Sequence, residues 1–122
     1  MGRREDNVVL TKSFDFSVRI VNLHKYLCST MSEYVMSKQL LRCGTSIGAN
    51  LSEAEEAVSA KDFEAKIYIA LKEARETEYW LRLLYRTEYL TEYQYGHIMA
   101  DCHQILSILV AITKTLRKNR RE

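Results

Sequence analysis

The chain has 122 residues, of which 47% are hydrophobic and 28% are charged. This length suits a single domain with one modest core, and the composition is globular rather than disordered. No uninterrupted apolar run approaches ~18 residues, so we expect no membrane partner, and the first six residues lack the apolar segment of a signal peptide. Three cysteines fit the reduced thiols of a cytoplasmic protein better than a disulfide framework.

Charge is unevenly distributed along the chain. The formal net charge is +2, but the chain without its basic ends holds 11 basic and 15 acidic residues and is therefore acidic. Clustered cations can neutralise phosphates, although basic termini are also common as solubilising tails. The candidate nucleic-acid contacts are the end cations Arg3, Arg4, Lys114, Arg117, Lys118, Arg120 and Arg121.

Long helices are the predicted secondary structure. The chain has no proline and only four glycines, so it lacks the residues of β-hairpin turns. Apolar residues recur instead at steps of three and four, which keeps them on one helix face. We predict helices at 13–29, 33–58, 60–86 and 92–118. Short connections favour antiparallel neighbours, so we expect one all-α domain over 1–122, an up-down-up-down four-helix bundle with basic termini at 1–6 and 117–122.

Polar residues mark the expected helix starts. Ser13, with Asp15 in the first turn, can begin the first helix. Each later helix is preceded by a hydroxyl three residues before a carboxyl or amide, the spacing of a capping box. These pairs are Thr30 with Glu33, Ser59 with Asp62, and Thr91 with Gln94.

The second helix contains the serine-hydrolase pattern G-x-S-x-G at Gly44–Gly48. That chemistry needs a strand that ends in a strained turn, and here the match lies inside a helical apolar pattern that extends to Val58. We therefore reject the hydrolase interpretation. Gly44 and Gly48, one helical turn apart, instead predict close approach of another backbone.

A polar stripe lies beside the apolar face of the second helix. Arg42, Ser46, Asn50 and Glu53 follow each other at steps of four, four and three. Groups that face a neighbouring helix need partners, and Glu73 and Glu76 on the third helix are candidates for Arg42. We favour a structural polar network of Arg42, Ser46, Asn50, Glu53, Glu73 and Glu76 over the alternative, a ligand site.

The third helix carries more apolar surface than a lone bundle needs. Surplus of this kind is typical of a subunit interface. The interface candidates are Tyr68, Ile69, Tyr79, Trp80, Leu83 and Tyr85. Five of the eight tyrosines lie between Tyr79 and Tyr95, and they could stack on bases, although we favour interface packing.

No pattern indicates catalysis, a metal or a cofactor. His24, His97 and His103 lack the Glu-x-x-His spacing of di-iron bundles, and no Cys-x-x-Cys or glycine-rich phosphate loop occurs. Cys43 and Cys102 fall at core positions, which predicts buried structural thiols. We expect a non-enzymatic protein without cofactors or metals.

Three segments resemble a known bacterial group: 39–54 (QLLRCGTSIGANLSEA), 62–67 (DFEAKI) and 70–81 (ALKEARETEYWL). The chain is similar, from about Ser13 to Leu116, to the four-helix-bundle proteins encoded in intervening sequences of ribosomal RNA genes, often labelled ribosomal proteins. Their superfamily includes the accessory variability proteins of diversity-generating retroelements. The resemblance implies an antiparallel bundle that forms a ring-like homopentamer and brings no catalytic residues.

The retroelement branch implies a positively charged assembly that binds nucleic acid and a reverse transcriptase. The acidic body of this chain is closer to the intervening-sequence branch. We expect a cytoplasmic homo-oligomer that binds RNA or DNA as an accessory protein, with avidity from repeated weak contacts. The alternative is a protein–protein scaffold or adaptor without nucleic-acid binding.

Overall fold

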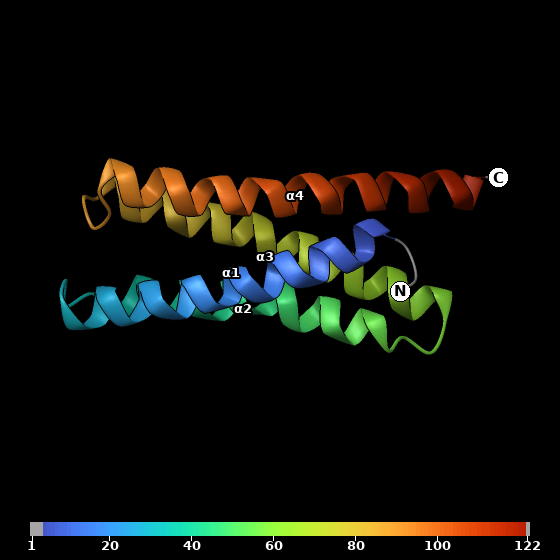
Figure 1. Ribbon diagram of the computed structural model, residues 1–122, viewed down its shortest axis with the longest axis horizontal. Coiled ribbons are helices and arrows are strands. Elements are labelled where there is room, and N and C mark those ends of the chain that lie inside the picture. The colour runs from blue at the N-terminus through green and yellow to red at the C-terminus, as the bar shows by residue number, and fades with distance from the viewer. Residues whose placement is uncertain (1–3, 122) are drawn as a thin grey trace.

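The computed structural model describes the backbone of residues 4–121 and the side chains of residues 8–120. The described chain forms four helices and no strand. They are α1 (Arg4–Ser29), α2 (Val35–Glu55), α3 (Ala60–Arg86) and α4 (Glu92–Arg121). The helices alternate in direction, and each packs on its chain neighbours while α1 also packs on α4 (Figure 1). The predicted all-α four-helix bundle is confirmed.

Helix α1 begins nine residues earlier than predicted, and α4 continues beyond residue 118. Val9 is fully buried and extends the apolar face of α1 toward the N-terminus. Ser13 does not start the helix: its hydroxyl lies in the core and donates to the carbonyl of Leu10 at 3.0 Å. The basic residues that we placed in a C-terminal tail instead extend α4.

One of the three predicted capping boxes, at Thr91, forms completely, and a second, at Ser59, forms in part. Thr91 Oγ1 accepts from the backbone N–H of Gln94 at 3.1 Å, and Gln94 Oε1 accepts from the backbone N–H of Thr91 at 2.8 Å. Ser59 Oγ accepts from the Asp62 amide at 3.0 Å. The Asp62 carboxylate reaches one residue further back than predicted and accepts from the Val58 amide at 3.3 Å.

Helix α2 starts two residues later and ends three residues earlier than the predicted 33–58. The helix begins at Val35, and the Glu33 carboxylate accepts from the Ser37 amide at 2.8 Å, so Glu33 caps the helix from outside rather than pairing with Thr30. At the other end, α2 stops at Glu55. Val58 lies in the following connection with 92% of its surface exposed, so it does not continue the apolar face.

Apolar side chains from all four helices form one core. The large, fully buried members are Val9, Phe16, Ile20, Leu27, Leu40, Ile47, Leu51, Ile67, Leu81, Leu84, Ile105 and Leu109. By length and composition alone, α4 also contains a window that could span a membrane. Because 44% of that window is buried inside the bundle, core packing accounts for much of its apolar character.

Helices α1 and α2 approach closely at the two glycines singled out from the sequence. A Cβ atom on Gly44 would lie 2.9 Å from Cγ1 and Cγ2 of Ile20. On Gly48 it would lie 3.2 Å from the carbonyl oxygen of Ser13 and from Oγ of Ser17. The absence of side chains therefore sets the separation of α1 and α2 at this crossing.

We expect Gly44→Ala to destabilise the bundle and Gly96→Ala to stabilise it. Either alanine gains up to ~1 kcal/mol of helix propensity, but overpacking against buried Ile20 costs ~1–3 kcal/mol at position 44. A Cβ atom on Gly96 meets nothing within 4 Å. Urea unfolding measures both, and equal effects at the two positions would contradict the close-packing argument.

Candidate nucleic-acid interface

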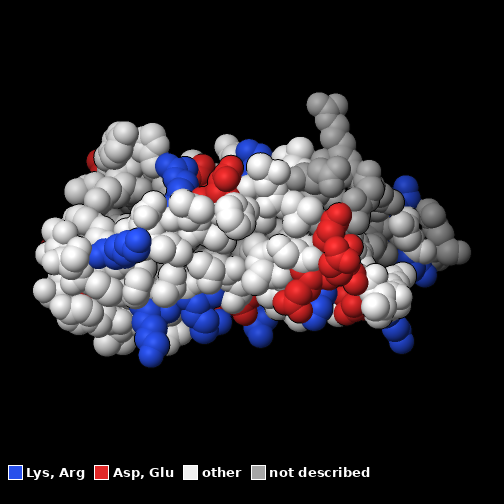
Figure 2. Space-filling view, turned by 60° about the horizontal axis from the view of Figure 1, so that its bottom comes forward, with Lys and Arg blue, Asp and Glu red and all other residues white. Residues whose placement is uncertain are grey.

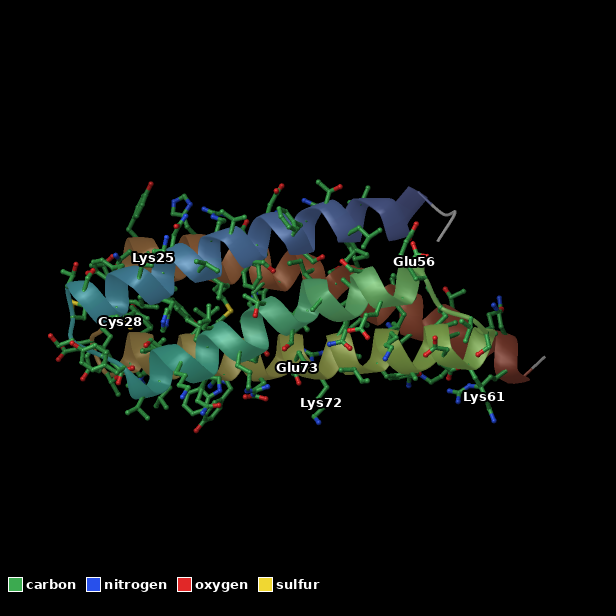
Figure 3. The ribbon with its side chains drawn as sticks, turned by 90° about the horizontal axis from the view of Figure 1, so that it is seen from below. Lys25, Cys28, Glu56, Lys61, Lys72 and Glu73 are labelled. Atoms are coloured by element: carbon green, nitrogen blue, oxygen red, sulfur yellow. The ribbon has the colours of Figure 1, made fainter. Side chains whose placement is uncertain are left out.

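The burial pattern of α3 fixes which of its residues face outward. Ile67, Ala74 and Leu81 are fully buried, so another side of the helix faces solvent. That side carries basic and tyrosine residues, with a first step of seven from Lys61 to Tyr68 and then steps of four and three to Arg86, and all except the half-buried Tyr68 are exposed. We call Lys61, Tyr68, Lys72, Arg75, Tyr79, Arg82 and Arg86 the α3 stripe. Figure 3 shows Lys61 and Lys72 projecting from the same outer side of the bundle.

The carboxylates near the α3 stripe are engaged by partners. Glu64 pairs with Arg120 of α4 at 3.0 Å. Glu78 lies 3.7 Å from Arg75 and 2.8 Å from His103 Nε2. Within the described side chains, by contrast, Arg82 and Arg86 make no ion pair. The outer side of α3 therefore presents uncompensated positive charge.

The other carboxylates of α3 face α2. Arg42 Nη1 donates to Glu73 Oε2 at 3.2 Å, and Arg42 Nη2 pairs with Glu76 Oε2. Trp80 Nε1 donates to the same Glu76 oxygen at 3.1 Å. The arrangement joins α2 to α3, and Figure 3 shows Glu73 between these helices.

The structure brings only part of the predicted polar network together. Ser46 Oγ donates to the carbonyl of Arg42 at 2.7 Å, and Asn50 Nδ2 donates to the carbonyl of Ser46 at 2.8 Å, so both bond within α2. Glu53 lies 3.4 Å from Lys66 and not beside Arg42. Each group has a protein partner, which favours a structural role over a ligand site.

The terminal cations predicted from the sequence divide into three groups. Lys114, Arg117 and Lys118 lie on α4 with their side chains at least partly exposed. Arg120 is occupied by Glu64. The third group lies outside the described residues or has an undescribed side chain: Arg3, Arg4 and Arg121.

An open hollow of about 540 Å³ lies between α3 and α4. Arg75 lines it from α3 and Lys114 from α4, with His103 and Ser107 also in the lining. The hollow, which Glu78 also lines, therefore places Arg75 of the α3 stripe close to Lys114, and Arg117 and Lys118 follow Lys114 along α4. Together they form one basic face that the sequence analysis, which separated the ends of the chain from its body, did not identify.

Acidic side chains gather on a different part of the surface. Glu53, Glu55 and Glu56 are exposed where α2 ends. Figure 2 shows an acidic patch toward the right-hand end of the molecule and basic side chains along its lower edge. The negative body charge counted from the sequence therefore does not describe the outer side of α3.

The predicted interface residues differ in exposure. Tyr79 is 56% exposed and Ile69 40% exposed, whereas Tyr68 and Leu83 are half-buried. Trp80 is half-buried against the core, and Tyr85 stacks on Tyr95 with ring centroids 4.3 Å apart. Much of the surface of Trp80 and Tyr85 is therefore covered by contacts within the same chain, which leaves less of it for a subunit interface.

An exposed apolar stripe on α1 was missed in the sequence. Phe14 is 69% exposed and Val18 is 47% exposed. They lie one helical turn apart, beside the face that carries Ser13 and Ser17 toward α2. The sequence did contain a sign of this stripe: Phe14 and Val18 are apolar and one turn apart, but they lie on a different face of α1 from the core residues Phe16 and Ile20.

The sites rejected from the sequence have ordinary structural surroundings. Ser46 of the G-x-S-x-G match lies within α2, with no strand before it in the described chain. Burial raises the pKa of Cys43 to about 11 and that of Cys102 to about 12, so both are protonated core thiols at neutral pH. Among the described residues, no cluster of three or more His, Cys, Asp or Glu side chains could hold a metal ion.

We expect Glu76 to make the bundle sensitive to acid. Hydrogen bonds from Arg42 and then Trp80 lower the pKa of Glu76 below its ordinary value of 4.5. The folded state therefore binds fewer protons than the unfolded state, so this stabilisation is complete above pH 4.5 and is lost as the pH falls through the lower, folded pKa. Urea unfolding across this range should show a flatter pH dependence for Glu76→Gln than for the parent.

Glu56→Gln is the matched control, because Glu56 is exposed at the end of α2. The control should follow the parent curve. Parallel pH curves for Glu76→Gln and the parent would show that the pairing with Arg42 contributes nothing to acid sensitivity.

Comparisons with known proteins give a family and a structural neighbour. The family described as 23S rRNA-intervening sequence protein matches residues 5–111. The crystal structure of a protein of unknown function from the S23 ribosomal protein family of Bacteroides thetaiotaomicron VPI-5482 superposes with a TM-score of 0.88 at 59% identity, covering 90% of this chain and 98% of that one. No curated protein matches. The chain therefore belongs to the 23S rRNA-intervening sequence protein family.

Proposed function

We propose that this protein is a non-enzymatic, oligomeric accessory protein that binds the phosphates of RNA or DNA through the basic face of α3 and α4. The observation that carries the proposal is the pairing of charges around α3. Its carboxylates bond to α2, to α4 or to the helix start, and of the stripe cations only Arg75 pairs with one of them, Glu78; Arg82 and Arg86 have no ion pair within the described side chains.

Free cations on one face suit a partner with regularly spaced negative charge. Lysine and arginine contacts to phosphates give affinity without sequence preference, and release of counterions makes that affinity fall with salt. The basic face extends along α3 from Lys61 to Arg86, ~38 Å at the rise of an α-helix, and adjoins Lys114 on α4. This shape supports binding along a nucleic-acid backbone rather than in a closed pocket.

The double substitution Arg82→Glu and Arg86→Glu should weaken nucleic-acid binding by ~10–100-fold and reduce the salt dependence. The slope of log affinity against log salt becomes shallower by ~0.7–0.9 for every phosphate that the variant no longer neutralises. Fluorescence anisotropy with a labelled single-stranded RNA, at several salt concentrations, measures both quantities.

Lys25→Glu is the control. It makes the same kind of charge change on α1, and Figure 3 shows Lys25 on the side of the bundle opposite Lys72. The control should bind like the parent once net charge is allowed for. Lys25→Glu makes half the charge change of the double variant, so a loss about half as large in log affinity would reduce the effect to net charge and overturn the assigned face.

A scaffold function is the second candidate, because Phe14 and Val18 leave apolar surface on α1 open to solvent. Burial of such a patch against another copy of the chain would support the oligomer, and burial against a different protein would support the scaffold. The α1 stripe does not overlap the α3 stripe, so both contacts could be made at once.

We expect Phe14→Glu with Val18→Glu to reduce the molar mass in solution from that of an oligomer toward 14.3 kDa. If Phe14 and Val18 lie in an apolar contact between copies, glutamates at these positions would bury unpaired charges there, which is costly and favours dissociation. Light scattering after size exclusion measures the mass, and Ala100→Glu, at an exposed position on α4 away from this stripe, is the control. A parent protein that is already monomeric would refute the oligomer.

A further inference from the structure

We infer that the α3 stripe binds single-stranded nucleic acid in preference to duplex, with Tyr79 as a stacking surface for an unpaired base. This inference rests on the proposed function and adds to it the class of nucleic acid. It starts from the position of Tyr79 among the cations of α3.

Tyr79 has a cation one turn away on each side. Arg75 precedes it by four residues and Arg82 follows it by three, so all three side chains project from neighbouring points on one helix face. Lys72 and Arg86 continue the series one turn further in each direction. A nucleic-acid strand whose phosphates bound these cations would therefore place its bases close to the Tyr79 ring.

The Tyr79 ring is open enough for stacking. It is 56% exposed, and its contact with Trp80 is edge-to-face, with centroids 5.1 Å apart and an angle of 79° between the rings. A perpendicular neighbour cannot cover both faces of the Tyr79 ring, so at least one face is free of Trp80. Trp80 donates a hydrogen bond to Glu76, which restricts the orientation of the indole ring that Tyr79 contacts.

The charges around Tyr79 argue against a two-fold contact at this point, in which two copies meet through the same residues. Arg75 and Arg82 of one copy would meet the same residues of the other, and like charges brought together oppose association. An exposed aromatic ring among cations is instead the arrangement with which proteins hold single strands, because every base has a face that can stack. In a duplex the bases are already stacked on each other, so only the phosphates remain for the stripe.

Binding of Tyr79→Ala and Tyr79→Phe to three labelled DNA probes tests the inference. The probes are a short oligothymidylate, an abasic strand with the same number of phosphates, and a duplex hairpin with the same number. Tyr79→Ala should weaken oligothymidylate binding by ~5–100-fold with little change in salt dependence, since stacking carries no charge. Its affinity for the abasic strand and the hairpin should stay unchanged, and Tyr79→Phe should retain binding.

Tyr93→Ala is the matched control. Tyr93 is 75% exposed on α4 and lies beside His97 rather than among cations, so its removal should not affect any probe. Circular dichroism and molar mass of each variant show whether the fold and the assembly are preserved. A fall in molar mass for Tyr79→Ala would make Tyr79 a subunit contact and overturn the inference.

The remaining outcomes separate this inference from the proposed function. Unchanged oligothymidylate binding by Tyr79→Ala, or an equal loss on oligothymidylate and hairpin, overturns stacking and leaves phosphate binding intact. Failure of the parent to bind any probe refutes the proposed function, and the stacking inference with it.

Discussion

The rotation of α3 about its own axis is the constraint on which the surface of this protein depends. Burial of Ile67, Ala74 and Leu81 sets that rotation, and the pairing of Arg42 with Glu73 and Glu76 holds it from the side of α2. A shift by one residue would turn the helix by ~100° and move charged side chains into the core. The arginines of the α3 stripe therefore face outward because the apolar residues and carboxylates of the same helix face elsewhere.

The sequence was sufficient to predict the helices but not all of their ends. Apolar steps of three and four identified every helix, and the capping box at Thr91 correctly placed the start of α4. The end of α2 and the start of α1 could not be obtained in this way. Val9 is buried and Val58 is exposed, although each continues a local apolar pattern, because burial depends on whether another helix lies opposite.

The candidate site was less predictable than the fold. Counting charge along the chain drew attention to Lys114 and Arg117, but it hid the cations of α3, which the same helix offsets with carboxylates. Whether a carboxylate cancels a neighbouring cation depends on where it points. Glu64 forms an ion pair with Arg120, which is distant in sequence, so adding up charges segment by segment could not have revealed that pair. The cations and tyrosines of the α3 stripe do recur in the sequence at steps that place them on one helix face, so helical spacing of charged residues was the signal for this face.

The exposed surfaces of α1 and α3 have different chemistry, which bears on how copies of the chain could assemble. Phe14 and Val18 gain from burial against another apolar surface, whereas Arg82 and Arg86 lose hydration if they are buried without partners. In the proposed oligomer, contacts through the apolar stripe would leave the α3 stripe of each copy facing solvent. Copies held in this way would present several basic faces to one strand, and linked weak contacts of this kind raise affinity without any new interaction. Assembly through α1 would then strengthen binding through α3, although the two surfaces share no residue.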